Sequence, residues 1–384
     1  KTAVDESDER GGAQGRRGVC PREAGMIGLT LGRYLSGRFL QQILVVFLSI
    51  SALSFLIDFV EMLRRSADSH VGAGFVAFMS FLRMPVASEQ ILPFAVLFGT
   101  MVAFVNLTRK LELVVARASG VSVWGFLVPP LAIALLIGLA SVFLYNPLAA
   151  AMKQRADEME IEMFGRTGAD KDAGVWLRQR SVDGRATIKA DKILDKGGRL
   201  EKVTVYLDDP YGHFVERIDA PGALLVPGAW KLTDATVVRP GGEAEKDGVY
   251  YLATDMNADD VLRSLMSPDS VPFWQLPVFR DRAEEAGLEG RTFALRYQTL
   301  LARPLMLIAM VLIAAAFSLR FFRFGGVGKM VAGGVAAGFV LYVATKMVGD
   351  MGDAGLLSPS IAAWSPALVG SLLGALALLH QEDG

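Results

Sequence analysis

Six long apolar stretches constrain this chain more than any other feature. Each is long enough for a helix of about 20 residues, the length that crosses a hydrocarbon core of about 30 Å. A helix is expected in each, because a lipid environment leaves no other partner for the backbone groups. The predicted spans are residues 35–57, 74–107, 123–145, 301–319, 330–348 and 361–380.

The composition fits a membrane protein that also carries a polar folded part. Hydrophobic residues make up 52% of the 384 residues and the mean hydropathy is +0.38, above the roughly 45–50% apolar content of soluble domains. Charged residues still account for 21%. The net charge of −1 disfavours a dedicated nucleic-acid binder, which needs a basic surplus. The single cysteine, Cys20, excludes an intramolecular disulfide and a cysteine-based zinc site.

The pattern of the sequence changes between the third and fourth spans. A charged, helix-like stretch at 152–163 precedes short segments in which every second residue is apolar, as at Val203, Val205 and Leu207. This is the period of a strand, and clusters of Gly, Pro and Asp separate the segments. We expect a small all-β sandwich or open barrel. Its predicted strands are 175–179, 186–190, 202–207, 214–220, 230–238 and 249–254.

Lysine and arginine in the short loops indicate the orientation. With the N-terminus in the cytoplasm, eight basic residues flank the spans on the inner side and only Arg64 and Arg65 lie in the short outer loops. Both termini are therefore expected in the cytoplasm and the β domain outside. The eight inner residues are Arg33, Arg38, Arg109, Lys110, Arg117, Arg320, Arg323 and Lys329.

The predicted division of the chain follows from these patterns. Residues 1–25 are polar and rich in Gly and Arg, so they are expected to be a disordered N-terminal extension. Residues 26–145 hold the first three spans, 146–296 the β domain and 297–384 the last three spans.

No catalytic motif stands out. The string closest to a P-loop, GGVGKM at 325–330, lacks the required spacing and the Ser or Thr. The three histidines are scattered, and neither H-E-x-x-H nor G-x-S-x-G occurs. The sequence therefore disfavours an enzyme.

The stretch 107–122 lies between the second and third spans on the predicted inner side. Leu111, Val114, Val115 and Ala118 share one face of a helix. Two interpretations remain open: a short helix that docks into a groove on a cytoplasmic partner, or an interfacial helix that lies on anionic lipid.

Arg64 and Arg65 end the first span on its outer side, against the positive-inside trend. A guanidinium group matches phosphate oxygens bidentately, so both are candidate phosphate ligands. The alternative is pairing with Asp58 and Glu61 on the same helix.

Three further basic residues lie near the outer ends of spans. Lys346 is deep enough in the fifth span to be a functional candidate, unless it snorkels to the interface or pairs with Asp350. Lys153 and Arg155 follow the third span. They either meet an anionic headgroup or belong to a solvated helix face.

Five motifs stand out along the chain. They are DFVEMLRR at 58–65, QILP at 90–93, LELVV at 111–115 leading to ASG at 118–120, WKL at 230–232 and AWSP at 363–366. Together with this layout, they resemble the LptF/LptG permeases of the lipopolysaccharide exporter of Gram-negative bacteria. The resemblance runs from about residue 31 to the C-terminus. Of the two siblings, the acidic-then-basic FVEMLRR is more like LptG, although LptG proteins can carry a basic residue where this chain has Asp58.

The resemblance implies a non-catalytic subunit of an ABC transporter in the bacterial inner membrane. Such a permease extracts lipopolysaccharide and passes it to a periplasmic bridge. The implied partners are an LptF-like sibling permease, an LptB-like ATPase dimer that holds ATP and Mg²⁺, and LptC- and LptA-like bridge proteins. No cofactor is implied for this chain, and its outer domain would be jellyroll-like.

The resemblance also assigns roles to residues. The first and fifth spans would form a lateral gate against the sibling, and 107–122 would be a cytoplasmic coupling helix. The implied ATPase-coupling residues are Glu112, Arg109, Leu113 and Arg117. The implied lipopolysaccharide-binding residues are Arg64, Arg65, Lys346 and, more weakly, Lys153 and Arg155.

Three other functions remain open on the residues alone. The chain could be the LptF sibling. It could be a lipid-modifying enzyme, which would need a catalytic constellation at the outer surface. It could also be a non-transporting scaffold with a periplasmic binding domain. Neither the enzyme nor the scaffold would depend on Glu112, so Glu112→Ala discriminates them from a transporter.

Overall fold

The computed structural model describes residues 21–66, 72–112, 123–164, 175–181, 184–194, 197–209, 213–257, 261, 267–285, 290–322 and 327–382. Within these residues, six helices are long and apolar enough to cross a membrane. A six-stranded sheet lies between the third and the fourth, so the predicted layout is confirmed. The six spans are Gly32–Arg65, Ala73–Arg109, Trp124–Glu160, Arg291–Leu319, Val331–Asp353 and Pro359–His380.

The first two helices are uninterrupted. Helix α1 (Pro21–Arg65) begins with a proline, which suits the first turn because its missing N–H would have no helical partner there. The start of α1 lies inside the predicted disordered extension, so residues 21–25 are helical, and residues 1–20 lie outside the described part. Helix α2 (Ala73–Arg109) remains helical through Pro85 and Pro93.

The third span continues well beyond the predicted end at Tyr145. Helix α4 (Val123–Ala140) passes through one π-helical turn, η1 (Ser141–Tyr145), into α5 (Asn146–Phe164). Pro147 follows the π turn, and a widened turn is one way for a helix to pass a proline that lacks a hydrogen-bond donor. The predicted third span and the charged stretch at 152–163 therefore form one continuous helical rod.

The helices after the sheet complete the bundle. Two short turns, η3 (Pro268–Ser270) and η4 (Phe273–Gln275), lead into α7 (Leu276–Glu285). Three long helices follow: α8 (Arg291–Phe322), α9 (Val327–Asp353) and α10 (Pro359–Glu382). The boundary expected at 145/146 falls inside the α4–η1–α5 rod, and the one expected at 296/297 falls inside α8. Apolarity ends near Tyr145 and begins again near Leu301, whereas the helices extend beyond these points.

The β domain is one antiparallel sheet in which each strand pairs with its sequence neighbours, in the order β1-β2-β3-β4-β5-β6. All six predicted strands are present. They are β1 (Val175–Ser181), β2 (Gly184–Leu194), β3 (Arg199–Asp208), β4 (Phe214–Val226), β5 (Ala229–Val238) and β6 (Glu245–Ala253).

The sheet curls around its own apolar face. Inward side chains such as Trp230, Leu232 and Ile188 form the core. The Gln179 amide of β1 donates to the Ala253 carbonyl at 3.0 Å, and the Thr254 hydroxyl donates to Gln179 at 2.6 Å, so the first strand meets the end of the last. The predicted open barrel fits this curl. The strands follow one another up and down through the sheet.

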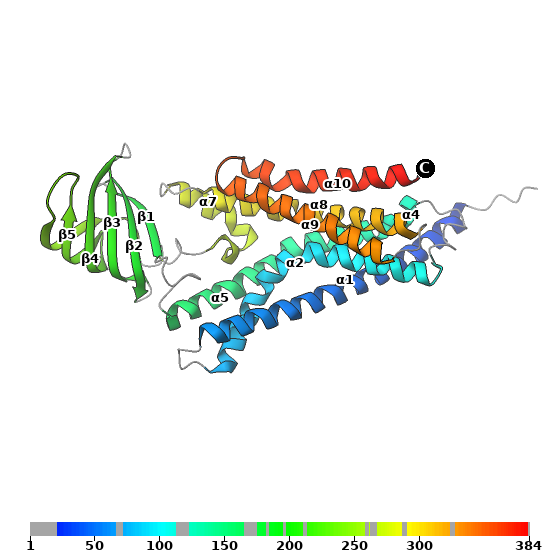
Figure 1. The fold of residues 1–384 in the computed structure, drawn as a ribbon, viewed down its shortest axis with the longest axis horizontal. Coiled ribbons are helices and arrows are strands. Elements are labelled where there is room, and N and C mark those ends of the chain that lie inside the picture. The colour runs from blue at the N-terminus through cyan, green and yellow to red at the C-terminus, as the bar shows by residue number, and fades with distance from the viewer. Residues whose placement is uncertain are drawn as a thin grey trace, which may run out of the picture.

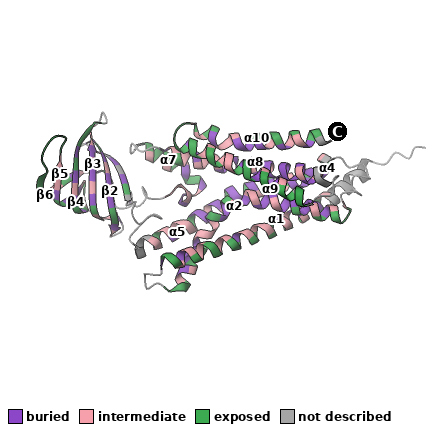
Figure 2. Ribbon diagram, in the orientation of Figure 1, coloured by how far each residue is buried: buried purple, intermediate pink, exposed green. Residues whose placement is uncertain are grey.

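The helices form one elongated body with the sheet at one end (Figure 1). Helix α1 starts, and α10 ends, at the opposite end of this body. The helices differ in burial, as Figure 2 shows by colour. In the apolar windows, 67% of residues are buried in α8 and 56% in α2, against 11% in α1 and 17% in α9. Helices α2 and α8 are therefore the centre, and α1 and α9 are peripheral.

Candidate functional site

Glu89 of α2 is the centre of a buried charge cluster inside the bundle. Its side chain is fully buried. One carboxylate oxygen accepts hydrogen bonds from Arg296 at 2.8 Å and Arg303 at 3.2 Å, both of α8. The other oxygen accepts from the Asn146 amide of α5 at 3.0 Å. Three helices are thereby held at one carboxylate.

Outer contacts complete the cluster. Arg303 also donates to the Ser141 hydroxyl of the π turn at 3.0 Å, and Arg296 contacts Asp269 at 3.1 Å. The Asn146 side-chain oxygen accepts the backbone N–H of Phe273 at 2.9 Å, which ties the segment following the sheet to the bundle. Two arginines thus face two carboxylates, as a buried ionic group requires.

The sequence interpretation missed this cluster. It did not single out Glu89, Arg296 or Arg303 as functional candidates. The available signal was that an ionisable residue within a span is a functional candidate by default. No local spacing could have revealed the partners, since Glu89 lies 207 and 214 positions away from the two arginines.

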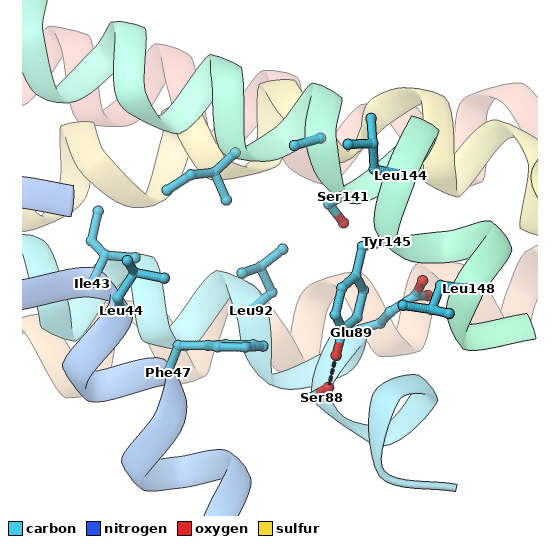
Figure 3. Close-up of a pocket in the computed structure, with 12 residues that line it drawn as sticks. Ile43, Leu44, Phe47, Ser88, Glu89, Leu92, Ser141, Leu144, Tyr145 and Leu148 are labelled. Carbon is cyan, nitrogen blue, oxygen red and sulfur yellow. Dashed lines mark hydrogen bonds between the residues drawn. The ribbon is translucent and has the colours of Figure 1, made fainter. Parts of the chain in front are cut away.

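An apolar cavity of about 350 Å³ lies beside this cluster, between α1, α2 and the α4–η1–α5 rod. Its lining includes Ile43, Phe47, Leu92 and Leu144. Figure 3 shows Tyr145 reaching from its helix to the Ser88 hydroxyl of α2. This hydrogen bond keeps the polar atoms at the cavity wall paired with each other.

A second cavity of about 400 Å³, here called the polar cavity, lies between α1, α2, α5 and α9. It brings together residues that are far apart in sequence. Three charged side chains from three helices line it, Asp58, Arg83 and Lys153, and Tyr342 contributes from α9. Among the predicted lipid-binding residues, Lys153 lies in its wall.

The other predicted lipid-binding residues lie on exposed helix surfaces. Arg64 and Arg65 both bond one Glu61 oxygen, each at 2.9 Å, with side chains 77% and 42% exposed. Of the two pairings considered for them, the one with Glu61 is therefore formed. Lys346 pairs with Asp350 at 3.1 Å.

The two basic residues of α5 also have acidic partners on their own helix. Arg155 faces Glu158 at 3.6 Å and remains exposed. Lys153 pairs with Asp157 and is mostly buried. The structure brings Lys153 to the polar cavity but does not join Arg155 to it.

The C-terminal end of α2 leads into the predicted coupling residues. Helix α2 ends at Arg109, and Leu111 turns the chain with a φ of 59°. The Tyr34 hydroxyl of α1 donates to Glu112 at 3.2 Å, so Glu112 is attached to the first span. Leu113 and Arg117, with most of the predicted 107–122 helix, lie outside the described residues.

Comparisons with known proteins fit this architecture. The family model for the lipopolysaccharide export system permeases LptF/LptG matches residues 33–380. The chain belongs to this family. It is 21% identical to the permease protein LptG of Haemophilus influenzae over 359 residues, which cover 90% of the chain and 95% of that protein. It is also 21% identical to LptG of Escherichia coli K12 over 362 residues, covering 92% and 98%.

Membership in the LptF/LptG family defines the general role. The chain is a multi-pass membrane permease of the lipopolysaccharide export system and a non-catalytic subunit, in a family without bound cofactors. The described residues contain no group of three or more His, Cys, Asp or Glu that could hold a metal ion. Both cavities and the buried charge cluster lie within the matched region.

Proposed function

We propose that this chain is the LptG-type permease and that it works with an LptF-like sibling, an LptB-like ATPase dimer and LptC- and LptA-like bridge proteins. The observation that carries the proposal is the polar cavity between α1 and α9, the two least buried spans. An apolar helix with so little internal packing meets lipid or another protein along most of its length.

The sibling permease would close this side of the molecule. Helices α1 and α9 would form the gate through which lipopolysaccharide enters from the inner membrane. The lipid's acyl chains would lie against the exposed apolar side chains of the two helices. Among these are Leu48 and Leu56 of α1 and Phe339 and Met347 of α9.

The number of carboxylates paired with each basic side chain indicates which of the proposed ligands binds a phosphate most favourably. Arg64 and Arg65 share the Glu61 carboxylate, so this group of three side chains keeps a surplus positive charge even with both ion pairs formed. Lys346, Lys153 and Arg155 each have a carboxylate of their own. A phosphate is therefore bound most favourably at Arg64 and Arg65, where no ion pair has to be broken.

The residues at the C-terminal end of α2 and just after it would couple this permease to the ATPase on the cytoplasmic side. Glu112 and Arg109, with Leu113 and Arg117 farther along, would contact the ATPase. Because Glu112 accepts a hydrogen bond from Tyr34 of α1, a displacement of Glu112 would reach the gate helix directly. ATP and Mg²⁺ would be bound by the partner, and the β domain would lie in the periplasm with both termini in the cytoplasm.

The test is to tag the C-terminus, extract the protein gently from its native membrane and identify by mass spectrometry what accompanies it. We expect a soluble ATPase, a second six-span permease and lipopolysaccharide. A co-purifying permease with the stronger LptG likeness would make this chain the LptF sibling instead. Recovery with periplasmic proteins only would refute the transporter and favour a scaffold.

A further inference from the structure

The charges around the polar cavity do not balance. Arg83 faces Glu160 at 3.8 Å, and Lys153 pairs with Asp157, which also accepts a hydrogen bond from Ser270. Each cation therefore has its own carboxylate. Asp58 is the remaining charge, so the group as a whole carries a surplus negative charge.

Asp58 itself has no partner within the described residues. Its Oδ2 atom is buried without a hydrogen bond, and no basic side chain lies within 4.0 Å of it. The side chain as a whole is partly buried, and a buried carboxylate oxygen that lacks a hydrogen-bond donor is costly. The chemical group that this wall of the cavity lacks is therefore a cationic hydrogen-bond donor.

The rest of the lining indicates which cation fits. Phe55, Phe94 and Tyr342 line the cavity, and the rings of Phe94 and Tyr342 lie 5.1 Å apart. Aromatic faces attract ammonium groups. A divalent metal ion would instead need six or more oxygen ligands, which one carboxylate among aromatic rings does not supply.

Arg83 adds a place for an anion next to this position. Its distance of 3.8 Å to Glu160 is long for an ion pair, and its other contact is the Met62 sulfur at 4.0 Å. A guanidinium held this loosely can turn toward a phosphate and bind it with two hydrogen bonds. The cavity thus presents a carboxylate and a guanidinium to one headgroup.

We infer that the polar cavity binds a phosphate group that carries a primary amine, with Asp58 accepting from the ammonium and Arg83 donating to the phosphate. The inference rests on the proposed function, since it makes this cavity a headgroup site of the permease. The same chemistry exists in two lipids. One is a lipopolysaccharide with ethanolamine attached to its phosphates, and the other is the bilayer lipid phosphatidylethanolamine.

The test uses the full chain with its co-purifying subunits in nanodiscs of phosphatidylglycerol, which has no amine. Dissociation constants are measured by native mass spectrometry for two lipopolysaccharides that differ only in ethanolamine on the phosphates. Phosphatidylethanolamine is the third probe. Asp58→Asn is the test variant, because it keeps the side-chain shape and removes the charge. Asp281→Asn is the control, because Asp281 of α7 is exposed, bonds Arg280 and does not line the cavity.

The wild type should bind the amine-bearing lipopolysaccharide roughly ten-fold more tightly, the size expected for one hydrogen bond to a charged group. Asp58→Asn should abolish that preference and Asp281→Asn should keep it. Equal binding of the two lipopolysaccharides, together with phosphatidylethanolamine binding that Asp58→Asn weakens, would support the inference and identify the bilayer lipid as the source.

Two other results separate this inference from the proposed function. Equal binding of both lipopolysaccharides, with phosphatidylethanolamine binding indifferent to Asp58→Asn, would overturn the inference and leave the transporter intact. A preference that survives Asp58→Asn would overturn it as well. If neither lipopolysaccharide binds, the proposed function is contradicted, and the effect of Asp58→Asn on phosphatidylethanolamine binding still tests the inference.

Discussion

Replacing Glu89 with Gln would remove the carboxylate at which α2, α5 and α8 meet. Arg303, which is 8% exposed, would lose its carboxylate partner and keep the hydrogen bond to the Ser141 hydroxyl. Arg296 would keep Asp269. Removing one partner of a buried ion pair typically costs 3–5 kcal/mol, and we expect about 3 kcal/mol here, because Gln still accepts a hydrogen bond and Arg296 retains a carboxylate.

The measurement is thermal unfolding of the purified protein in detergent, with Glu61→Gln as the matched control. Glu61 also bonds two arginines, but at an exposed site, where an ion pair contributes about 0–1 kcal/mol. The double variant Glu89→Gln with Arg303→Met should be less destabilised than Glu89→Gln alone, because it also removes the uncompensated charge. Equal effects of Glu89→Gln and Glu61→Gln would refute the view that the cluster holds the bundle together.

Three further predictions concern lipid binding, coupling and helix packing. Replacing both Arg64 and Arg65 by Glu should abolish cross-linking of lipopolysaccharide to the chain, and unchanged cross-linking would remove these residues from the binding site. Glu112→Ala should lower ATP-driven release of lipopolysaccharide in proteoliposomes without lowering its binding, and full release would refute the coupling role. Gly99→Ala places a Cβ 2.5 Å from the Ile43 backbone and should lower the unfolding temperature, at a cost of about 1–3 kcal/mol. Gly349→Ala meets open space and should not lower it.

The spans and strands were predictable because their signals are local. A run of about 20 apolar residues and an alternation of period two can each be recognised within one segment. The ends of the helices were not predictable in this way. Apolarity ends near Tyr145 and begins again near Leu301, whereas the helices run on to Phe164 and start at Arg291. Hydropathy therefore marked the part of each helix suited to the membrane, not the whole helix.

The candidate site was predictable only where partners are close in sequence. The spacing of Glu61 to Arg64 and Arg65 predicts their ion pairs, and these are formed. The polar cavity combines Asp58, Arg83 and Lys153 from three helices, and no local pattern carries that information. The tertiary arrangement was needed to show that Asp58 is unpaired while its basic neighbours are not.

The position of α1 connects the two ends of the molecule in the proposed mechanism. A helix of 45 residues is about 67 Å long at 1.5 Å per residue. Its inner part bonds Glu112 through Tyr34, and its outer part contributes Asp58 to the polar cavity. Few residues in its apolar window are buried, so little internal packing resists its displacement. A movement at the ATPase side could therefore change the headgroup cavity through one rigid helix, while the buried charge cluster keeps α2, α5 and α8 in place.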